Sequence, residues 1–171
     1  VIRVEQGRGI QMNKGARIGR GRILLFLHAD SKVQFFARED ILSSCNKGSN
    51  WGYFGVRIDG TGLLFRIIER GMSIRSRWTG IATGDQGIFV TKDLFARAGG
   101  FKNIPLMEDI DLSERLCAQE RPAVCRTVIT TSARRWKKGG ILRTILMMWC
   151  LRLAWFFGMS PTKLARIYGY K

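Results

Sequence analysis

Two acidic positions in this sequence have the residue types that group-transfer chemistry needs. The first is Asp30, in the tripeptide His28-Ala29-Asp30 that directly follows the apolar run 23–27. A carboxylate at the carboxyl end of a buried strand lies where open α/β sheets bind ligands, and it can hold Mg²⁺ or Mn²⁺ together with substrate phosphates. A loop or cap aspartate gives the same pattern, and His28 suits metal ligation, support of a ligand or strand-end packing.

The second position is the run Glu108-Asp109-Ile110-Asp111, at the expected start of a helix. Adjacent carboxylates differ in their surroundings, so one can act as a general base while a cationic or backbone partner holds the other. Acids in a first helical turn also stabilise the helix through its dipole, and this structural role explains most such clusters. Glu108 and Asp109 are therefore candidates for acid–base chemistry, with helix stabilisation as the alternative.

Two further segments could contact a ligand. Gly84-Asp85-Gln86-Gly87 places Asp85 and Gln86 between glycines, which lets a ligand approach the backbone closely but equally suits an ordinary turn. Arg134-Arg135-Trp136, followed by two lysines, could bind phosphate and stack on a sugar or a base. A charge run is more often a solvated face, so this segment alone does not define a site.

The elements that must position these residues can be predicted from the spacing of apolar residues. Strands are expected at 23–27, 52–59, 86–90 and 123–129, and helices at 11–18, 36–45, 63–78, 91–98 and 109–119. The first strand is predicted to be buried on both faces, whereas the second alternates so that Tyr53, Arg57 and Asp59 share a wetter face. Helices that alternate with strands predict an α/β fold.

A distinctive tail begins after Gly139-Gly140, so we divide the chain into a core at 1–140 and an apolar, aromatic tail at 141–171. Polar residues such as Arg143 and Arg152 interrupt the tail too often to predict a membrane-spanning helix of about 20 residues. Two interpretations stay open: a helix packed on the core with its arginines reaching solvent, or a helix on an anionic membrane surface. The second would place the protein on the inner face of the membrane.

The composition limits the class of protein. With 171 residues, of which 46% are hydrophobic, the chain has the size of one domain and enough apolar material for a core. Lysine and arginine number 29 against 13 acids, a net charge of +16, which indicates a polyanionic partner such as nucleic acid, anionic lipid or a phosphorylated substrate. Four cysteines without a CxxC pair, with a single histidine, argue against a structural zinc site and favour the reducing cytoplasm.

Several separated strings, taken in order, resemble the family 2 glycosyltransferases of GT-A fold. These strings are His28-Ala29-Asp30, Gly84-Asp85-Gln86-Gly87, Gly99-Gly100-Phe101, Glu108-Asp109 and Arg134-Arg135-Trp136. More narrowly, Leu25-Phe26-Leu27-His28-Ala29-Asp30, Pro105-Leu106-Met107-Glu108-Asp109 and Thr131-Ser132-Ala133-Arg134-Arg135-Trp136 resemble the bacterial branch called radical-SAM/selenodomain-associated transferase 2. The likeness covers the chain from Arg8 to its carboxyl terminus.

This resemblance implies a GT-A-like mixed sheet flanked by helices. It also implies transfer of a sugar, with inversion and with Mg²⁺ or Mn²⁺, from a nucleotide-diphosphate donor to an acceptor hydroxyl. Asp30 takes the last position of the family's Asp-x-Asp motif, and His28 stands where the first aspartate usually is, so these two residues would hold the metal. Asp109 would be the general base, with Glu108 as its supporting carboxylate.

The resemblance implies that the remaining motifs contact the nucleotide-sugar donor. It says less about the acceptor. Asp85 and Gln86 would contact the donor, and Arg134, Arg135 and Trp136 would lie near the diphosphate, although the family's leading glutamine is absent. The basic residues and the aromatic tail favour a lipid-linked acceptor at an anionic membrane surface.

The resemblance also implies that the fold is truncated at its amino terminus. The family begins with two strands that help to bind the nucleotide, and these 171 residues contain neither. We therefore expect this chain alone to bind a donor poorly, and a longer parent to be the transferase. Two alternatives are an inactive, membrane-associated relative of these enzymes and a basic nucleic-acid-binding module. The basic residues form no recognised motif for specific nucleic-acid binding.

Overall fold

The computed structural model describes residues 4–170, without the side chains of residues 135, 137 and 138. Its centre is a four-stranded mixed sheet with the strand order β1-β3-β2-β4. The strands are β1 (Ile23–Phe26), β2 (Trp51–Asp59), β3 (Ile88–Thr91) and β4 (Ala123–Ser132). β3 pairs antiparallel with both β1 and β2, whereas β2 and β4 run parallel.

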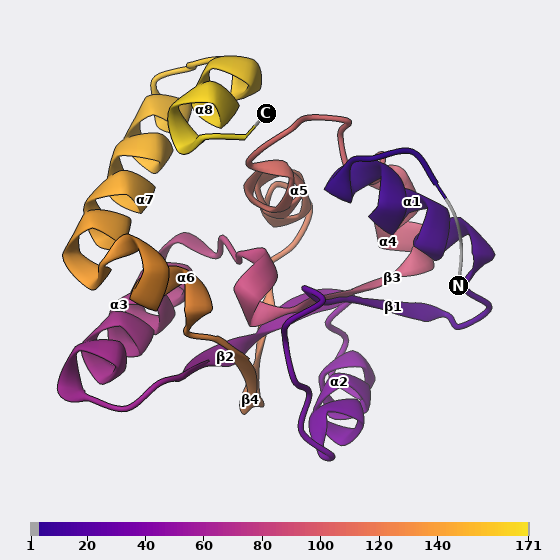
Figure 1. Ribbon diagram of the computed structural model, residues 1–171. Coiled ribbons are helices and arrows are strands. Elements are labelled where there is room, and N and C mark those ends of the chain that lie inside the picture. Colours follow the sequence, from indigo (N-terminus) through magenta and orange to yellow (C-terminus); the bar gives the residue numbers. More distant parts are fainter. Residues whose placement is uncertain (1–3, 171) are drawn as a thin grey trace.

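Helices cover both faces of this sheet (Figure 1). One face carries α2 (Ala37–Asn46). On the other side lie α1 (Arg8–Ile18), α3 (Leu63–Thr79), the 3₁₀ turn η1 (Gly84–Gln86), α4 (Lys92–Arg97), α5 (Glu108–Cys117), α6 (Arg134–Gly139), α7 (Ile141–Phe156) and α8 (Pro161–Tyr168). The predicted α/β class, with a mixed sheet flanked by helices, is confirmed.

The core forms two layers because successive side chains of a strand point to opposite faces of the sheet. Tyr53 and Ile88 are buried in one cluster, together with residues of α4 and α5. Phe54 and Phe89, the next residues along the same strands, are buried on the opposite side against Ile41 of α2. Each such buried side chain contributes about 1.5–3 kcal/mol, so the two clusters hold the sheet between its helical layers.

Two predictions about strand burial were wrong. β1 is not buried on both faces: Leu24 is 8% exposed, but Leu25 is 36% exposed. The reason is that β1 lies at an edge of the sheet, where the α2 side is only partly covered. Tyr53 does not face solvent but is 1% exposed, because β2 is a central strand there, while Arg57 and Asp59 are exposed as predicted.

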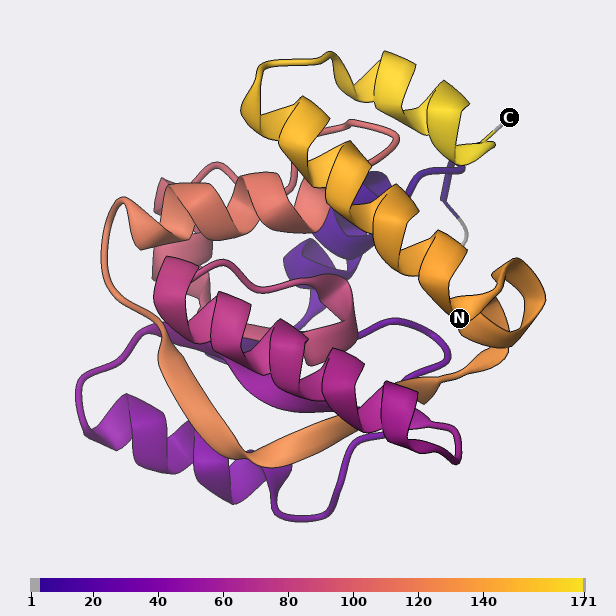
Figure 2. The same cartoon turned by 90° about the vertical axis from the view of Figure 1, so that its left-hand side faces the viewer.

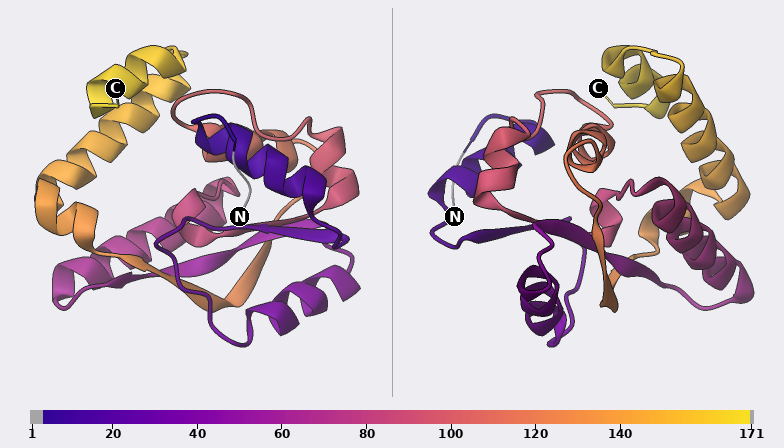
Figure 3. Two further views of the ribbon diagram at one scale, coloured as in Figure 1. Left: turned by 45° about the vertical axis from the view of Figure 1, so that its right-hand side comes forward. Right: turned by 180° about the vertical axis from the view of Figure 1, so that it is seen from behind.

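The tail folds back over α5, as Figures 2 and 3 show from three directions. Leu151 of α7 and Leu164 of α8 are buried in one cluster with Leu106 and Ile110. Part of the outer surface of α7 remains apolar and exposed, at Leu142, Leu146, Trp149 and Leu153. The expected packing of the tail on the core is therefore observed for one side of α7. Within residues 4–170, each helix is too short or too polar to cross a membrane.

Candidate functional site

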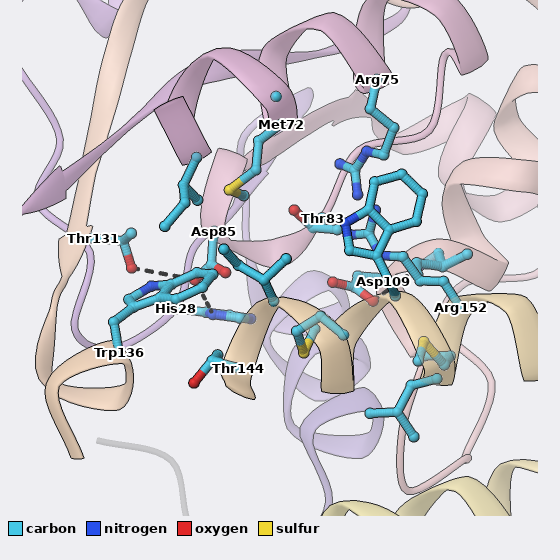
Figure 4. Close-up of a pocket in the computed structure, with 18 of the residues that line it drawn as sticks. His28, Met72, Arg75, Thr83, Asp85, Asp109, Thr131, Trp136, Thr144 and Arg152 are labelled. Atoms are coloured by element: carbon cyan, nitrogen blue, oxygen red, sulfur yellow. Dashed lines mark hydrogen bonds and ion pairs between the residues drawn. The ribbon is translucent and has the colours of Figure 1, made fainter. Parts of the chain in front are cut away.

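A cavity of about 310 Å³ lies between the sheet, α3, the start of α5 and α7. Its polar lining comes from the sheet side and the turns that follow the strands, including His28, Asp30, Thr83, Asp85, Asp109 and Thr131. Its apolar lining comes mainly from α3 and α7, including Ile67, Ile68, Met72, Ile145, Met148 and Trp149. Figure 4 shows part of this lining, with His28, Asp85 and Asp109 among the labelled residues. The cavity is thus polar on one side and apolar on the other.

His28 and Asp85 form an ion pair at the polar side of the cavity. His28 Nδ1 lies 3.3 Å from Asp85 Oδ1, and Thr131 Oγ1 donates to the same carboxylate oxygen at 3.2 Å. The hydrogen bond with Asp85 raises the pKa of His28, although burial of the imidazole opposes this shift. His28 therefore keeps its positive charge to a higher pH than a free histidine.

The glycine of η1 makes this position of His28 possible. A Cβ on Gly84 would lie 2.0 Å from His28 Nε2, so any other residue would displace the ring or the turn. The backbone N–H of Gly84 donates to Asp109 Oδ2 at 2.7 Å. Gly84 thus touches the imidazole and also holds the carboxylate expected to be the base.

Asp109 lies in the first turn of α5, where the sequence predicted it, and it lines the cavity. Its second oxygen, Oδ1, accepts the N–H of Ile110 at 2.8 Å. The residue before this turn, Met107, has the left-handed backbone angle φ 69° and is buried in the cluster beneath α7. Such backbone strain in a non-glycine residue persists only where packing enforces it. Here the packing sets the direction in which α5 begins.

Glu108 does not line the cavity, although its partner Arg8 does. Glu108 is 1% exposed, and its Oε1 lies 3.0 Å from Arg8 Nε of α1. Burial raises the pKa of Glu108, and the neighbouring Asp109 charge raises it further, while Arg8 lowers it. The structure therefore gives Glu108 a position that links α1 to α5 behind the candidate base.

Gln86 is fully buried and does not line the cavity. Its Oε1 accepts from Ser76 Oγ at 2.8 Å, from the Thr83 backbone N–H at 3.2 Å and from Arg75 Nη2 at 3.3 Å. These bonds tie α3 to η1. The expectation that Gln86 contacts a nucleotide-diphosphate sugar remains a prediction. Its hydrogen bonds to α3 and Thr83 are observed.

The residues of the basic segment in α6 differ in their position relative to the cavity. Trp136 is half-buried and lines the cavity, whereas the exposed Arg134 does not. The side chain of Arg135 lies outside the described part of the structure, so its expected role near a diphosphate is not addressed. Of this motif, the tryptophan is the member that the fold brings to the candidate site.

Three arginines of the cavity were missed at the sequence level, namely Arg8 of α1, which pairs with Glu108, and two from longer helices. These two, Arg75 of α3 and Arg152 of α7, line the cavity from elements that carry no recognised motif. Arg75 follows Ile68 and Met72 at helical spacing, so the inner face of α3 could have indicated it. Arg152 follows Met148 by four residues on α7, but nothing in the sequence showed which face of that helix would be covered.

The carboxylates at the cavity suit a hard divalent cation in an open site. Asp30 is exposed at the cavity wall, and Asp85 and Asp109 line the same space. Mg²⁺ typically takes one or two protein carboxylates and completes its shell with water and substrate phosphates. Within the described residues, no group of three or more acidic, histidine or cysteine side chains is arranged to hold a metal by itself. A cation at this wall would therefore take further ligands from water or a phosphate, and its binding remains a prediction.

The fold brings five of the predicted site residues to one cavity: His28, Asp30, Asp85, Asp109 and Trp136. Neither protein-family models nor curated proteins gave a match to this chain. Its function is therefore inferred from its own residues and their arrangement.

Proposed function

We propose that this chain is the core of a glycosyltransferase of GT-A type, similar to family 2 and most similar to the radical-SAM/selenodomain-associated transferase 2 branch. One observation carries the proposal: His28 with Asp30, Asp85, and Asp109 come from three separate segments of the sequence, yet they line one cavity. These residues belong to the strings that support the resemblance. A nucleotide-diphosphate sugar would be the donor, and an acceptor hydroxyl would receive the sugar with inversion.

Asp109 is the base in this proposal. Its carboxylate takes the proton of the acceptor hydroxyl, the oxygen forms a bond to the anomeric carbon, and the bond from that carbon to the diphosphate oxygen breaks. The leaving diphosphate keeps the electron pair. Two backbone N–H groups, of Gly84 and Ile110, donate to the Asp109 oxygens and fix their orientation. Each oxygen has a second lone pair that can accept the proton.

Charge on the leaving diphosphate would be neutralised at the same polar side of the cavity. Asp30 would hold Mg²⁺ or Mn²⁺, which when bound supplies positive charge to the phosphate oxygens. His28 would add positive charge when it is protonated, and its hydrogen bond with Asp85 raises its pKa. Preorganised charges of this kind are worth most in a site partly shielded from water. The expected role of His28 as a metal ligand remains a prediction, since its Nδ1 is engaged by Asp85.

The acceptor and the location of the protein are part of the same proposal. We propose a lipid-linked acceptor at the inner face of the cytoplasmic membrane. The exposed apolar residues of α7 support this, as do Phe156 and Phe157 at its carboxyl end, which are 81% and 80% exposed. The net charge of +16 suits an anionic bilayer surface.

Donor binding tests the proposed site. Calorimetric titration with UDP and GDP, in Mn²⁺ and in EDTA, should show metal-dependent binding that Asp30→Ala weakens by about tenfold or more, because a carboxylate ligand of the cation is lost. The titration is made on the chain together with any natural sequence that precedes Val1, because the resemblance places part of the nucleotide pocket there. Asp93→Ala, in the exposed first turn of α4, is the matched control. Equal affinities in the wild type and Asp30→Ala would contradict the assignment.

A further inference from the structure

The apolar side of the cavity has no use in binding a nucleotide-diphosphate sugar alone. It is formed by Ile67, Ile68 and Met72 of α3 and by Ile145, Met148 and Trp149 of α7. Ile67 and Trp149 are more than half exposed, at 55% and 58%. The apolar lining therefore continues from the interior of the cavity to the surface, between two helices. A ligand bound there can keep a hydrocarbon chain in contact with protein along its length.

Arg75 and Arg152 bring positive charge to this apolar side. Arg75 Nη2 donates to Ser76 Oγ at 2.8 Å and to Gln86 Oε1 at 3.3 Å, but its Nε is buried without a hydrogen bond. Arg152 Nε is likewise buried without a hydrogen bond among the described residues. Figure 4 shows both side chains at the same pocket as Asp109, one from α3 and one from α7.

Burial of the Arg75 guanidinium lowers its pKa, and the charges of Asp109 and Asp85 oppose this shift without a direct ion pair to Arg75. Within residues 4–170, neither Arg75 nor Arg152 has an ion pair with a carboxylate. The Asp109 oxygens accept backbone N–H groups, and Glu108 faces Arg8. A partly buried guanidinium without a directly paired anion is costly, and phosphate is the anion whose geometry two guanidinium groups match best. On the apolar side of the cavity, Arg75 and Arg152 both lack such a direct partner among the described residues.

We infer that the cavity binds a phosphorylated amphiphile, with its phosphate between Arg75 and Arg152 and its hydrocarbon chain along Ile67, Met72 and Met148. This inference rests on the proposed function for the reaction and names the class of its acceptor: an apolar chain that carries a phosphate close to the hydroxyl that reacts. The phosphate would lie in the same cavity as Asp109. The hydrocarbon chain would leave between α3 and α7, past Ile67 and Trp149, toward the exposed apolar residues of α7.

Binding of simple alkyl phosphates to the whole chain tests this inference without any donor. Butyl, octyl and decyl phosphate, each below its micelle concentration, are titrated by calorimetry beside inorganic phosphate and octanol. Affinity should rise with chain length, by up to about fourfold for each methylene that is buried. Octanol and inorganic phosphate should each bind more weakly than octyl phosphate. Equal affinity for butyl and decyl phosphate would overturn the amphiphile, and equal affinity for octanol and octyl phosphate would overturn the phosphate site.

Two matched pairs of variants assign the two parts of the ligand. Arg152→Gln should weaken decyl phosphate binding by about tenfold or more, whereas Arg143→Gln, on the exposed part of α7 outside the cavity, should not change it. Ile67→Asn should weaken decyl phosphate more than butyl phosphate. Ile74→Asn, a similarly exposed position of α3 that does not line the cavity, should change neither.

The outcomes separate this inference from the proposed function. Unchanged affinity in Arg152→Gln or in Ile67→Asn would overturn the inference. If either variant does not fold, the chain-length series on the wild type decides by itself. Suppose that alkyl phosphates bind as described, but the chain with any natural sequence that precedes Val1 binds neither UDP nor GDP. This result would contradict the transferase and leave the amphiphile site standing. Binding of UDP or GDP, with alkyl phosphate affinities that do not depend on the length of the alkyl chain, would support the transferase and contradict the amphiphile site.

Discussion

At the scale of single residues, the polar side of the cavity is organised around Gly84. Its missing side chain leaves room for the His28 imidazole, and its N–H orients Asp109. Asp85, the next residue, holds His28 through Nδ1. The sequence indicated these residues one motif at a time. It could not show that they meet, because the contacts join segments 25 positions apart for Gly84 and Asp109, and more than 50 apart for His28 and Asp85.

The pair between His28 and Asp85 makes a prediction about pH. Because the pKa of folded His28 is raised, the pair stabilises the fold fully below the ordinary histidine value of about 6.5 and loses this contribution as pH rises through the raised value. Asp85→Asn should therefore lower the free energy of unfolding by about 1 kcal/mol more in mild acid than in alkali. Urea unfolding at several pH values measures this difference. If Asp85→Asn lowered the free energy of unfolding equally at every pH, Asp85 would not raise the pKa of His28.

At the scale of elements, periodicity predicted the helices well and the strand environments less well. α3 forms one helix from Leu63 to Thr79, as its apolar spacing indicated. β1 looked like a central buried strand because its residues are uniformly apolar, yet it lies at the edge of the sheet. Strand order depends on contacts distant in the sequence, which no local pattern records. For the same reason Arg75 and Arg152 could be assigned to helices but not to the cavity.

Gln86 connects α3 to η1, and its removal gives a second prediction, which concerns stability. Its carbonyl oxygen accepts from Ser76, Thr83 and Arg75, so Gln86→Ala would leave buried donors of α3 and η1 without an acceptor. We expect a loss of about 2–4 kcal/mol in unfolding free energy. Gln11→Ala, at an exposed position of α1, should change it by less than about 0.5 kcal/mol. Chemical denaturation compares the two variants. A loss for Gln86→Ala no greater than that for Gln11→Ala would contradict the structural role.

At the scale of the whole molecule, the proposed contact with a bilayer is supported by the net charge and by exposed aromatic residues. The net charge is +16, and the exposed aromatic residues Phe156 and Phe157 lie at the end of α7. A second exposed pair, Phe35 and Phe36, lies just before α2, which covers the opposite face of the sheet. The two pairs are chemically equivalent and differ in position, so they form an internal control for the orientation of the protein on a membrane.

Vesicle binding tests this orientation. The chain should bind vesicles that contain phosphatidylglycerol more tightly than vesicles of phosphatidylcholine, and salt should weaken the binding. Replacing Phe156 and Phe157 by serine should lower the affinity by about tenfold or more, because each buried phenylalanine contributes about 1.5–3 kcal/mol. The same replacement at Phe35 and Phe36 should have little effect. Equal losses from both pairs in vesicle sedimentation would contradict the proposed face.

The central claim is that Asp109 is the base for sugar transfer in this cavity, and turnover of nucleotide-diphosphate sugars measures it most directly. Release of UDP or GDP is followed for the chain with any natural sequence that precedes Val1. We predict that Asp109→Asn lowers turnover by about 10²–10⁴-fold without weakening nucleotide binding, because a carboxamide cannot take the proton. Asp93→Asn should keep the wild-type rate. Unchanged turnover in Asp109→Asn would contradict the account.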